Sequence, residues 1–218
     1  MKTAFAVVAV AGLAAVANAD VTINEILGST TSTDDEFIEL YNTGGSAIDL
    51  TGWSLELWDS DAGSAFGGVD GFGSLSLSGS IAAGGYFLLA NAEFGNNYSA
   101  TPDQTFANNG IENSSYTVVL RDATSAVIET LFVTDGGAGD AANIAGTTIT
   151  ADSTVGPDGT FLPAGGYRIG DGGANWGILE FSTKPAPSAT PGAANIPAPA
   201  SLALLGLGGL AAGRRRRA

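Results

Sequence analysis

Three short runs decide the fold: INEIL at residues 23–27, EFIELYN at residues 36–42 and DLTGWSL at residues 49–55. Apolar residues alternate with polar ones in each run, and turn-forming residues separate the runs. This period of two is typical of short antiparallel β-strands that bury one face. The beginning of the chain therefore predicts a β-sheet.

Glu39 lies in the middle of the second run, on the same face as Phe37 and Tyr41, because side chains alternate along a strand. Two interpretations of Glu39 stay open. It is a solvated carboxylate on the outer face of the sheet, or a buried or half-buried hydrogen-bond acceptor. The acidic residues 34–36, just before the strand, are expected to keep its edge soluble.

Further strand patterns follow at regular intervals, and no long amphipathic helix is visible. Residues 59–73, 91–113 and 134–160 are polar or Gly-rich and are expected to be loops. This organisation predicts an all-β fold, an antiparallel β-sandwich, with a closed barrel as the alternative. The strand patterns cover residues 53–58, 74–78, 86–90, 116–120, 127–133, 166–169 and 176–181.

The composition excludes several kinds of chemistry. The chain has 218 residues with no Cys and no His, so Ser-His-Asp triads, Cys-His dyads and imidazole or thiolate metal sites are excluded. Between residues 20 and 195, three basic residues stand against 22 acidic ones, a net charge of −19. Such a body repels nucleic acid, so no nucleic-acid partner is expected.

The N-terminal residues 1–19 have the features of a signal peptide. Lys2 precedes an apolar run at residues 4–16, which is too short to span a membrane. Ala17 and Ala19 are small residues at the positions that a signal peptidase reads. Cleavage is expected after Ala19, which leaves Asp20 at the new N-terminus.

The C-terminal residues 196–218 have three parts: a Pro-containing motif, an apolar run at residues 202–213 and a basic run. The apolar run is a short hydrophobic helix near the lower limit for spanning a membrane, and the basic run favours a cytoplasmic end. The motif is Pro197, Ala198 and Pro199, and the basic run is Arg214, Arg215, Arg216 and Arg217.

This tail resembles the PEP-CTERM sorting signal of Gram-negative bacteria with exopolysaccharide systems, which an exosortase recognises and cuts. Ala198 stands where that signal has Glu between its prolines. The resemblance implies an exosortase-like partner and transient attachment to the inner membrane. A simple C-terminal membrane anchor is the alternative.

The body resembles the lamin-tail domain, an immunoglobulin-like β-sandwich. The three opening runs carry the resemblance, together with IAAGGYFLLA at residues 81–90, the hairpin at residues 116–131 and ATPGAAN at residues 189–195. The resemblance implies one lamin-tail sandwich over residues 20–195, between the signal peptide and the sorting tail.

One acidic loop invites a metal interpretation. Asp59, Asp61 and Asp70 span twelve residues, but Ser64 and Asp70 stand where an EF-hand has Gly and Glu. The loop is therefore a looser calcium site or a solvated acidic turn. No other cofactor is expected.

Aromatic and acidic side chains leave the function open. The Trp and Tyr residues 41, 53, 58, 86, 167 and 176 could form a sugar-stacking face, although Trp53 and Tyr41 are expected in the core. We expect a non-enzymatic interaction or structural module of the cell surface or extracellular matrix, which binds a polysaccharide or a surface protein. The alternatives are a calcium-stabilised matrix protein and a hydrolase that uses two carboxylates.

Overall fold

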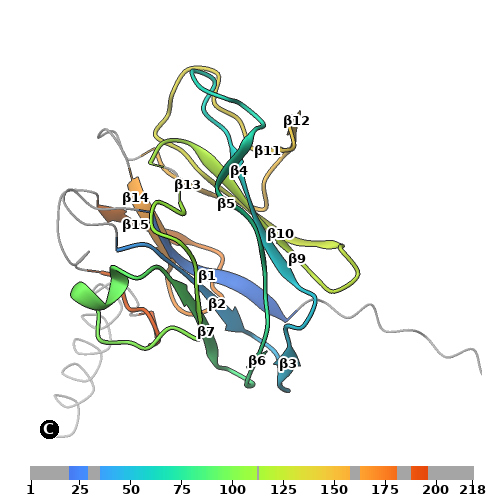
Figure 1. Ribbon diagram of the computed structural model, residues 1–218, viewed down its shortest axis with the longest axis vertical. Helices are drawn as coiled ribbons and strands as arrows, with labels where there is room; N and C mark the ends of the chain where they lie inside the picture. Colours follow the sequence, from blue (N-terminus) through green and yellow to red (C-terminus); the bar gives the residue numbers. More distant parts are fainter. Residues whose placement is uncertain (1–19, 29–34, 112, 158–162, 181–187, 196–218) are drawn as a thin grey trace, which may run out of the picture.

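Two β-sheets pack face to face in the computed structural model (Figure 1). The structure describes residues 20–28, 35–111, 113–157, 163–180 and 188–195. The one helical element of this part is a single 3-10 turn, η1 (Phe94–Asn96). The predicted all-β, immunoglobulin-like sandwich is confirmed. The described part of the chain contains no helix that is long and apolar enough to cross a membrane. The helix expected at residues 202–213 lies outside the described residues.

The first sheet is built around the N-terminal strand. In spatial order its strands are β15 (Trp176–Glu180), β14 (Pro163–Arg168), β1 (Val21–Leu27), β2 (Phe37–Asn42), β7 (Tyr86–Ala90) and β8 (Gln104–Thr105). Strand β1 lies between β2 and β14, and its register shifts between Ile23 and Glu25 on the β2 side. Every pairing is antiparallel except that of β7 with β8.

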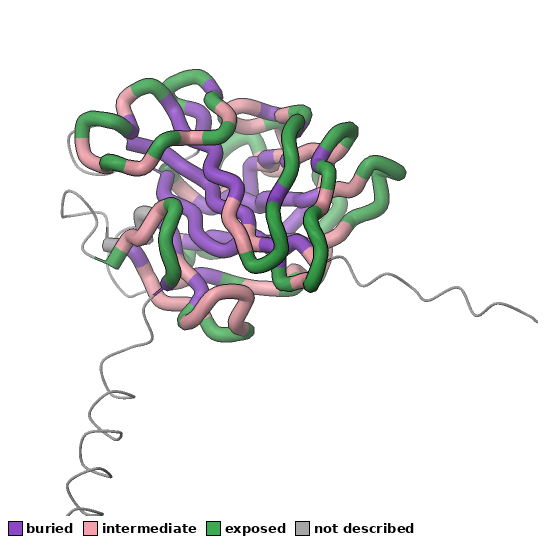
Figure 2. The backbone as a smooth tube through the Cα atoms, turned by 90° about the horizontal axis from the view of Figure 1, so that it is seen from below, coloured by how far each residue is buried: buried purple, intermediate pink, exposed green. Residues whose placement is uncertain are grey.

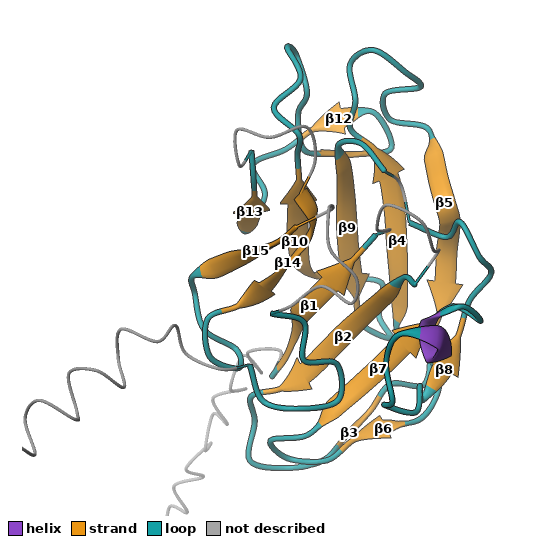
Figure 3. Ribbon diagram, turned by 90° about the vertical axis from the view of Figure 1, so that its left-hand side faces the viewer, coloured by secondary structure: helices purple, strands orange, loops and turns teal. Residues whose placement is uncertain are grey.

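The second sheet contains the predicted hairpin of residues 116–131, which forms as β9 and β10. In spatial order its strands are β13 (Ser153–Val155), β10 (Val127–Val133), β9 (Tyr116–Arg121), β4 (Ser54–Asp59) and β5 (Val69–Ser76). Two short ladders lie at opposite ends of the sandwich, as Figure 3 shows. They are β3 (Ile48–Asp49) with β6 (Ser80–Ile81), and β11 (Asn143–Ile144) with β12 (Thr147–Thr148).

Strand β5 corrects one expectation. Residues 59–73 were expected to be a loop, but β5 begins at Val69, which lies opposite Trp58 after a register shift. Gly71 and Gly73 have φ angles of 47° and 68°, a conformation that Gly adopts without steric cost. These glycines hide the alternating pattern from a sequence reading, although Phe72 still packs against the core.

The main core lies between the sheets, where the buried stretches in Figure 2 converge. Ile38 and Leu40 of β2 point into it, with Leu55, Val118 and Leu131 of the second sheet. All five side chains are fully buried.

A second, smaller core covers the opposite face of the first sheet. Phe37 contacts the Phe94 ring at a centroid distance of 5.6 Å, and Phe94 stacks on Tyr98 at 5.0 Å. Ala189 also packs against this cluster. Strand β2 is thus buried on both faces, and the expectation of one buried face is wrong. The loop after β7 and the segment at residues 188–195 exclude water from the outer face.

Candidate functional site

Four glutamates that lie in strands or next to one are buried. Glu25, Glu36 and Glu39 are fully buried, and Glu129 is 7% exposed. Burying a carboxylate is costly unless it accepts hydrogen bonds, and each of these four does. Glu39 is therefore the buried acceptor, and the solvated interpretation is wrong.

The expectation that residues 34–36 keep an edge soluble is wrong for Asp35 and Glu36, which are fully buried. Glu36 accepts hydrogen bonds from the backbone N–H groups of Gly110 and Ile111, at 2.8 and 3.0 Å. Asp35 accepts one from the Asn97 side chain. The two carboxylates anchor the long excursion between β7 and β9.

Residues 188–195, the last segment that the structure describes, cross the outer face of the first sheet, and we name this segment the strap. It contains the TPGAAN sequence and ends one residue before the predicted sorting tail. Three carboxylates each accept one strap N–H. These bonds are Thr190 N to Glu25 Oε1 at 3.0 Å, Gly192 N to Glu39 Oε2 at 2.6 Å and Asn195 N to Asp171 Oδ1 at 3.0 Å.

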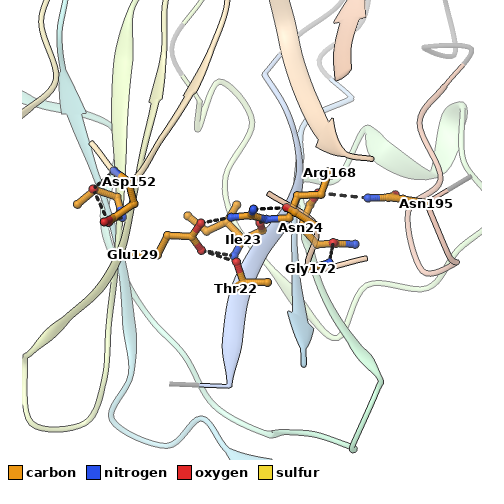
Figure 4. A network of polar contacts seen from close by, with 10 residues as sticks. Thr22, Ile23, Asn24, Glu129, Asp152, Arg168, Gly172 and Asn195 are labelled. Carbon is orange, nitrogen blue, oxygen red and sulfur yellow. Dashed lines mark hydrogen bonds and ion pairs between the residues drawn. The ribbon is translucent and has the colours of Figure 1, made fainter. Parts of the chain in front are cut away.

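Asn24 joins two of the three carboxylates, Glu39 and Asp171. Its side-chain N–H₂ donates to Glu39 Oε1 at 2.8 Å and to Asp171 Oδ1 at 3.1 Å. Its backbone oxygen accepts from the Asn195 side chain at 3.3 Å, and Figure 4 shows this pair. The Tyr86 hydroxyl donates to Asp171 Oδ2 at 2.7 Å. We refer to Glu25, Glu39 and Asp171 as the carboxylate cluster.

Burial sets the electrostatics of this cluster. Desolvation raises the pKa of Glu25 well above its ordinary value, and the charge of Glu39 raises it further. Desolvation also raises the pKa of Glu39 to about 7, although hydrogen bonds from Asn24 and Gly192 oppose the shift. Glu25 and Glu39 therefore bind protons that an unfolded chain would release near pH 4.5.

A pH-dependent stability follows from the raised pKa of Glu39. The native state binds more protons than the unfolded state between pH 4.5 and about 7, so the free energy of unfolding falls as pH rises through this window. We expect a loss of about 2 kcal/mol between pH 5 and pH 8 from Glu39 alone. Urea unfolding at both pH values measures it. In Glu39→Gln the slope flattens, and an unchanged slope would contradict the assignment.

A pocket of about 340 Å³ lies beside the strap. The strap forms one wall and the loop after η1 the other, and none of the lining side chains is charged. The lining residues are Asn97, Tyr98, Ser99, Ala100, Ala189, Thr190, Pro191 and Ala193.

A buried ion pair joins the two sheets. Arg168 of β14 pairs with Glu129 of β10, and its Nε–H also donates to the backbone oxygen of Ile23 at 2.7 Å (Figure 4). Glu129 accepts from Ile23 N and from the Thr22 hydroxyl, both at 2.7 Å. Burial raises the pKa of Glu129, while the Arg168 charge opposes that shift. The Arg168 guanidinium stacks over the Trp176 ring, 4.7 Å from its centroid.

The calcium candidates have local partners. Asp59 is buried and accepts from the N–H groups of Asp61 and Ala65. Asp61 accepts from Gly63 N, and Asp70 from Gly71 N. Within the described ranges no group of three His, Cys, Asp or Glu side chains could hold a metal ion. Calcium binding stays a prediction, which melting with millimolar calcium or chelator would test.

The six aromatic residues considered for sugar stacking are all half-buried. Trp53 and Trp176 pack against the main core, and Tyr41 lies 5.2 Å from Tyr86 on the outer face. Trp58 donates from Nε1 to Glu56 at 3.1 Å. These six residues therefore do not form an exposed aromatic platform.

The processing candidates fall mainly at the termini. Asp20 is described, and its backbone oxygen accepts from Thr43 N at 2.6 Å. The other candidates lie outside the described residues: Ala17, Ala19, Pro197, Ala198, Pro199, Arg214, Arg215, Arg216 and Arg217.

Sequence reasoning missed the strap and its three carboxylates. A signal was present for Glu39, which stands between Ile38 and Leu40 in one of the strongest strand patterns. Solvated carboxylates are more usual at strand ends and turns. The partners lie up to 165 positions away in the chain, and no local pattern encodes that contact.

Two family models match the chain. The Lamin Tail Domain model matches residues 14–135, and the PEP-CTERM protein-sorting motif matches residues 195–217. No curated protein matches. The Lamin Tail Domain match stops at residue 135, but β14 and β15 lie in the same sheet as β1.

Proposed function

Because the chain belongs to the lamin tail domain family, we propose that it is a non-enzymatic interaction or structural module of the cell surface or extracellular matrix. The match of the C-terminal sorting motif carries the exported, exosortase-sorted part of this proposal. The domain would comprise residues 20–195, between a signal peptide at residues 1–19 and a sorting tail at residues 196–218. An exosortase-like enzyme would cut the tail after transient attachment at the inner membrane.

The buried carboxylates support a non-enzymatic role. An acid–base pair for glycoside hydrolysis must reach the substrate, with its carboxyl groups ~5 to ~9.5 Å apart around it. Glu25 and Glu39 are fully buried, and strap N–H groups occupy their oxygens. A sugar cannot approach either carboxylate while the strap is in place.

The charge favours particular ligands for the exported module. With a net charge of −19 between residues 20 and 195, the domain would repel anionic polysaccharides at low salt. The uncharged lining of the strap pocket is compatible with a neutral sugar or with a protein segment. We therefore favour a neutral polysaccharide or a surface protein as the partner of the domain in the matrix.

Fractionation of producing cells with intact-mass analysis tests the delivery route. We expect the surface form to begin at Asp20 and to lack Arg214–Arg217. A matched variant with the four arginines replaced by serine is expected to escape correct sorting, because the positive end of the tail is lost. A surface form that retains Arg214–Arg217 would overturn exosortase processing.

A further inference from the structure

The strap is held on the carboxylate cluster by hydrogen bonds in addition to the apolar packing of Ala189. Three carboxylates from β1, β2 and the β14–β15 loop converge beneath one segment, and each accepts a backbone N–H from it. Backbone N–H groups are strong donors, but they carry no charge that could neutralise a carboxylate. The strap N–H groups therefore bond the carboxylates without balancing their negative charge.

No cation balances this cluster in the described part of the chain. The described residues form two ion pairs, Arg121 with Glu56 and Arg168 with Glu129, and neither pair includes a carboxylate of the cluster. Four phenols also lie on the covered face: Tyr41 on β2, Tyr86 on β7, Tyr98 after η1 and Tyr167 on β14. Two further carboxylates belong to the elements packed there: Asp35 accepts from the Asn97 side chain, and Asp103 accepts from Leu88 N. Desolvation raises the pKa of Tyr86, so its phenol stays protonated and keeps donating to Asp171.

We propose that the strap is a pH-sensitive latch, docked on the carboxylate cluster in mildly acidic medium and released as Glu25 and Glu39 both become ionised. Release lets water reach Glu25 and Glu39, which relieves the desolvation and the mutual repulsion of the charges. The main core does not depend on the strap, because it lies between the sheets on the opposite face of β2. The latch can therefore open without loss of the sandwich.

The latch would determine how far the sorting tail can extend from the fold. This step rests on the proposed function. Asn195 is 3% exposed and is held by Asn24 and Asp171, one residue before the sorting tail starts. A docked strap fixes the point where the tail leaves the fold. A released strap adds eight residues of chain, or about 25 Å when extended.

Hydrogen exchange on the purified full chain tests the latch. The protection factors of the Thr190, Gly192 and Asn195 amides are compared at pH 5.5 and pH 8.5, after correction for intrinsic exchange rates. We expect at least a ~10-fold fall for the strap amides at the higher pH, because a carboxyl shifted from 4.5 to about 7 favours the open state when ionised. Amides of β9 are expected to stay protected.

Matched Glu→Gln variants distinguish release of the strap from a loss of amide protection throughout the fold. Glu39→Gln keeps an oxygen that accepts from Gly192 N but does not ionise, so the fall in strap protection is expected to shrink several-fold. Glu25→Gln is the second variant if the first does not fold. Glu56→Gln, in the second sheet, is the control and is expected to behave as wild type.

Three results would overturn the latch: strap protection that does not change with pH, a fall shared equally by β9, or an undiminished fall in Glu39→Gln. The experiment needs no sorting enzyme. Its failure is therefore distinct from a failure of exosortase processing, which the intact-mass analysis detects by itself.

Discussion

Arg168→Met is expected to lower the free energy of unfolding by roughly 3–5 kcal/mol, the largest effect that we expect from a single substitution. The change leaves Glu129 as a buried charge without its cation. It also removes the hydrogen bond to the Ile23 oxygen and the stacking on Trp176. Because the pair links β10 to β14, the loss acts on the contact between the sheets. Urea denaturation at pH 7 measures it.

Arg121→Met is the matched control. Arg121 also pairs with a glutamate, Glu56, at 2.7 Å, but their side chains are 20% and 18% exposed. Water and salt screen such a pair, so the expected loss is under ~1 kcal/mol. A similar loss in both variants would contradict the special role of the buried pair.

The double variant Glu129→Gln with Arg168→Met tests the origin of the loss. The glutamine oxygen still accepts from Ile23 N, while the uncompensated charge is gone. We expect it to recover more than half of the stability lost in Arg168→Met, because the dominant penalty is an unpaired buried carboxylate. No recovery would show that packing against Trp176 accounts for the loss.

Glu36→Ala is expected to cost about 3 kcal/mol. The backbone N–H groups of Gly110 and Ile111 are buried against Glu36 and lose their acceptor, at roughly 1–3 kcal/mol for each unsatisfied group. The Asn91 side chain loses its contact with Glu36 as well. The same assay measures the cost, and hydrogen exchange would show the excursion between β7 and β9 opening first.

Glu93→Ala is the control for this prediction. Glu93 lies in the same excursion and is half-buried, and its carboxylate bonds the exposed Asn96 side chain. An exposed contact of this kind is worth less than ~0.5 kcal/mol. A loss at Glu36 as small as that at Glu93 would mean that water replaces the Glu36 carboxylate without cost.

The fold could be predicted because side chains alternate between the two faces of a strand, which gives the sequence a period of two. Phe37, Ile38, Glu39 and Leu40 point alternately to the two faces of β2. The hairpin of β9 and β10 is closed by a short turn between strands that are neighbours in the sequence. The strand β5 was misplaced because Gly71 and Gly73 carry no side chain to continue the pattern.

The site could not be predicted in the same way. The same alternation placed Glu39 on the face of Phe37 and Tyr41, but it left open whether that face meets water, and Tyr41 was expected in the core. In the structure this face lies opposite the main core, and Glu39 is fully buried there. Whether a second layer covers it depends on the strap and on the loop around Phe94, which are far away in the sequence. A buried carboxylate on an outer face is therefore a tertiary property, invisible to local periodicity.

The central place of β1 in its sheet has a consequence for the order of folding. Glu25 lies opposite Glu39 on one side and opposite Tyr167 on the other. The first neighbour follows β1 closely, but the second arrives only after most of the chain has been made, so one edge of β1 stays open meanwhile. Closing so long a loop is slow, and an open edge invites pairing with other chains. A chain truncated before β14 would retain that edge, which a protease or a chaperone could recognise.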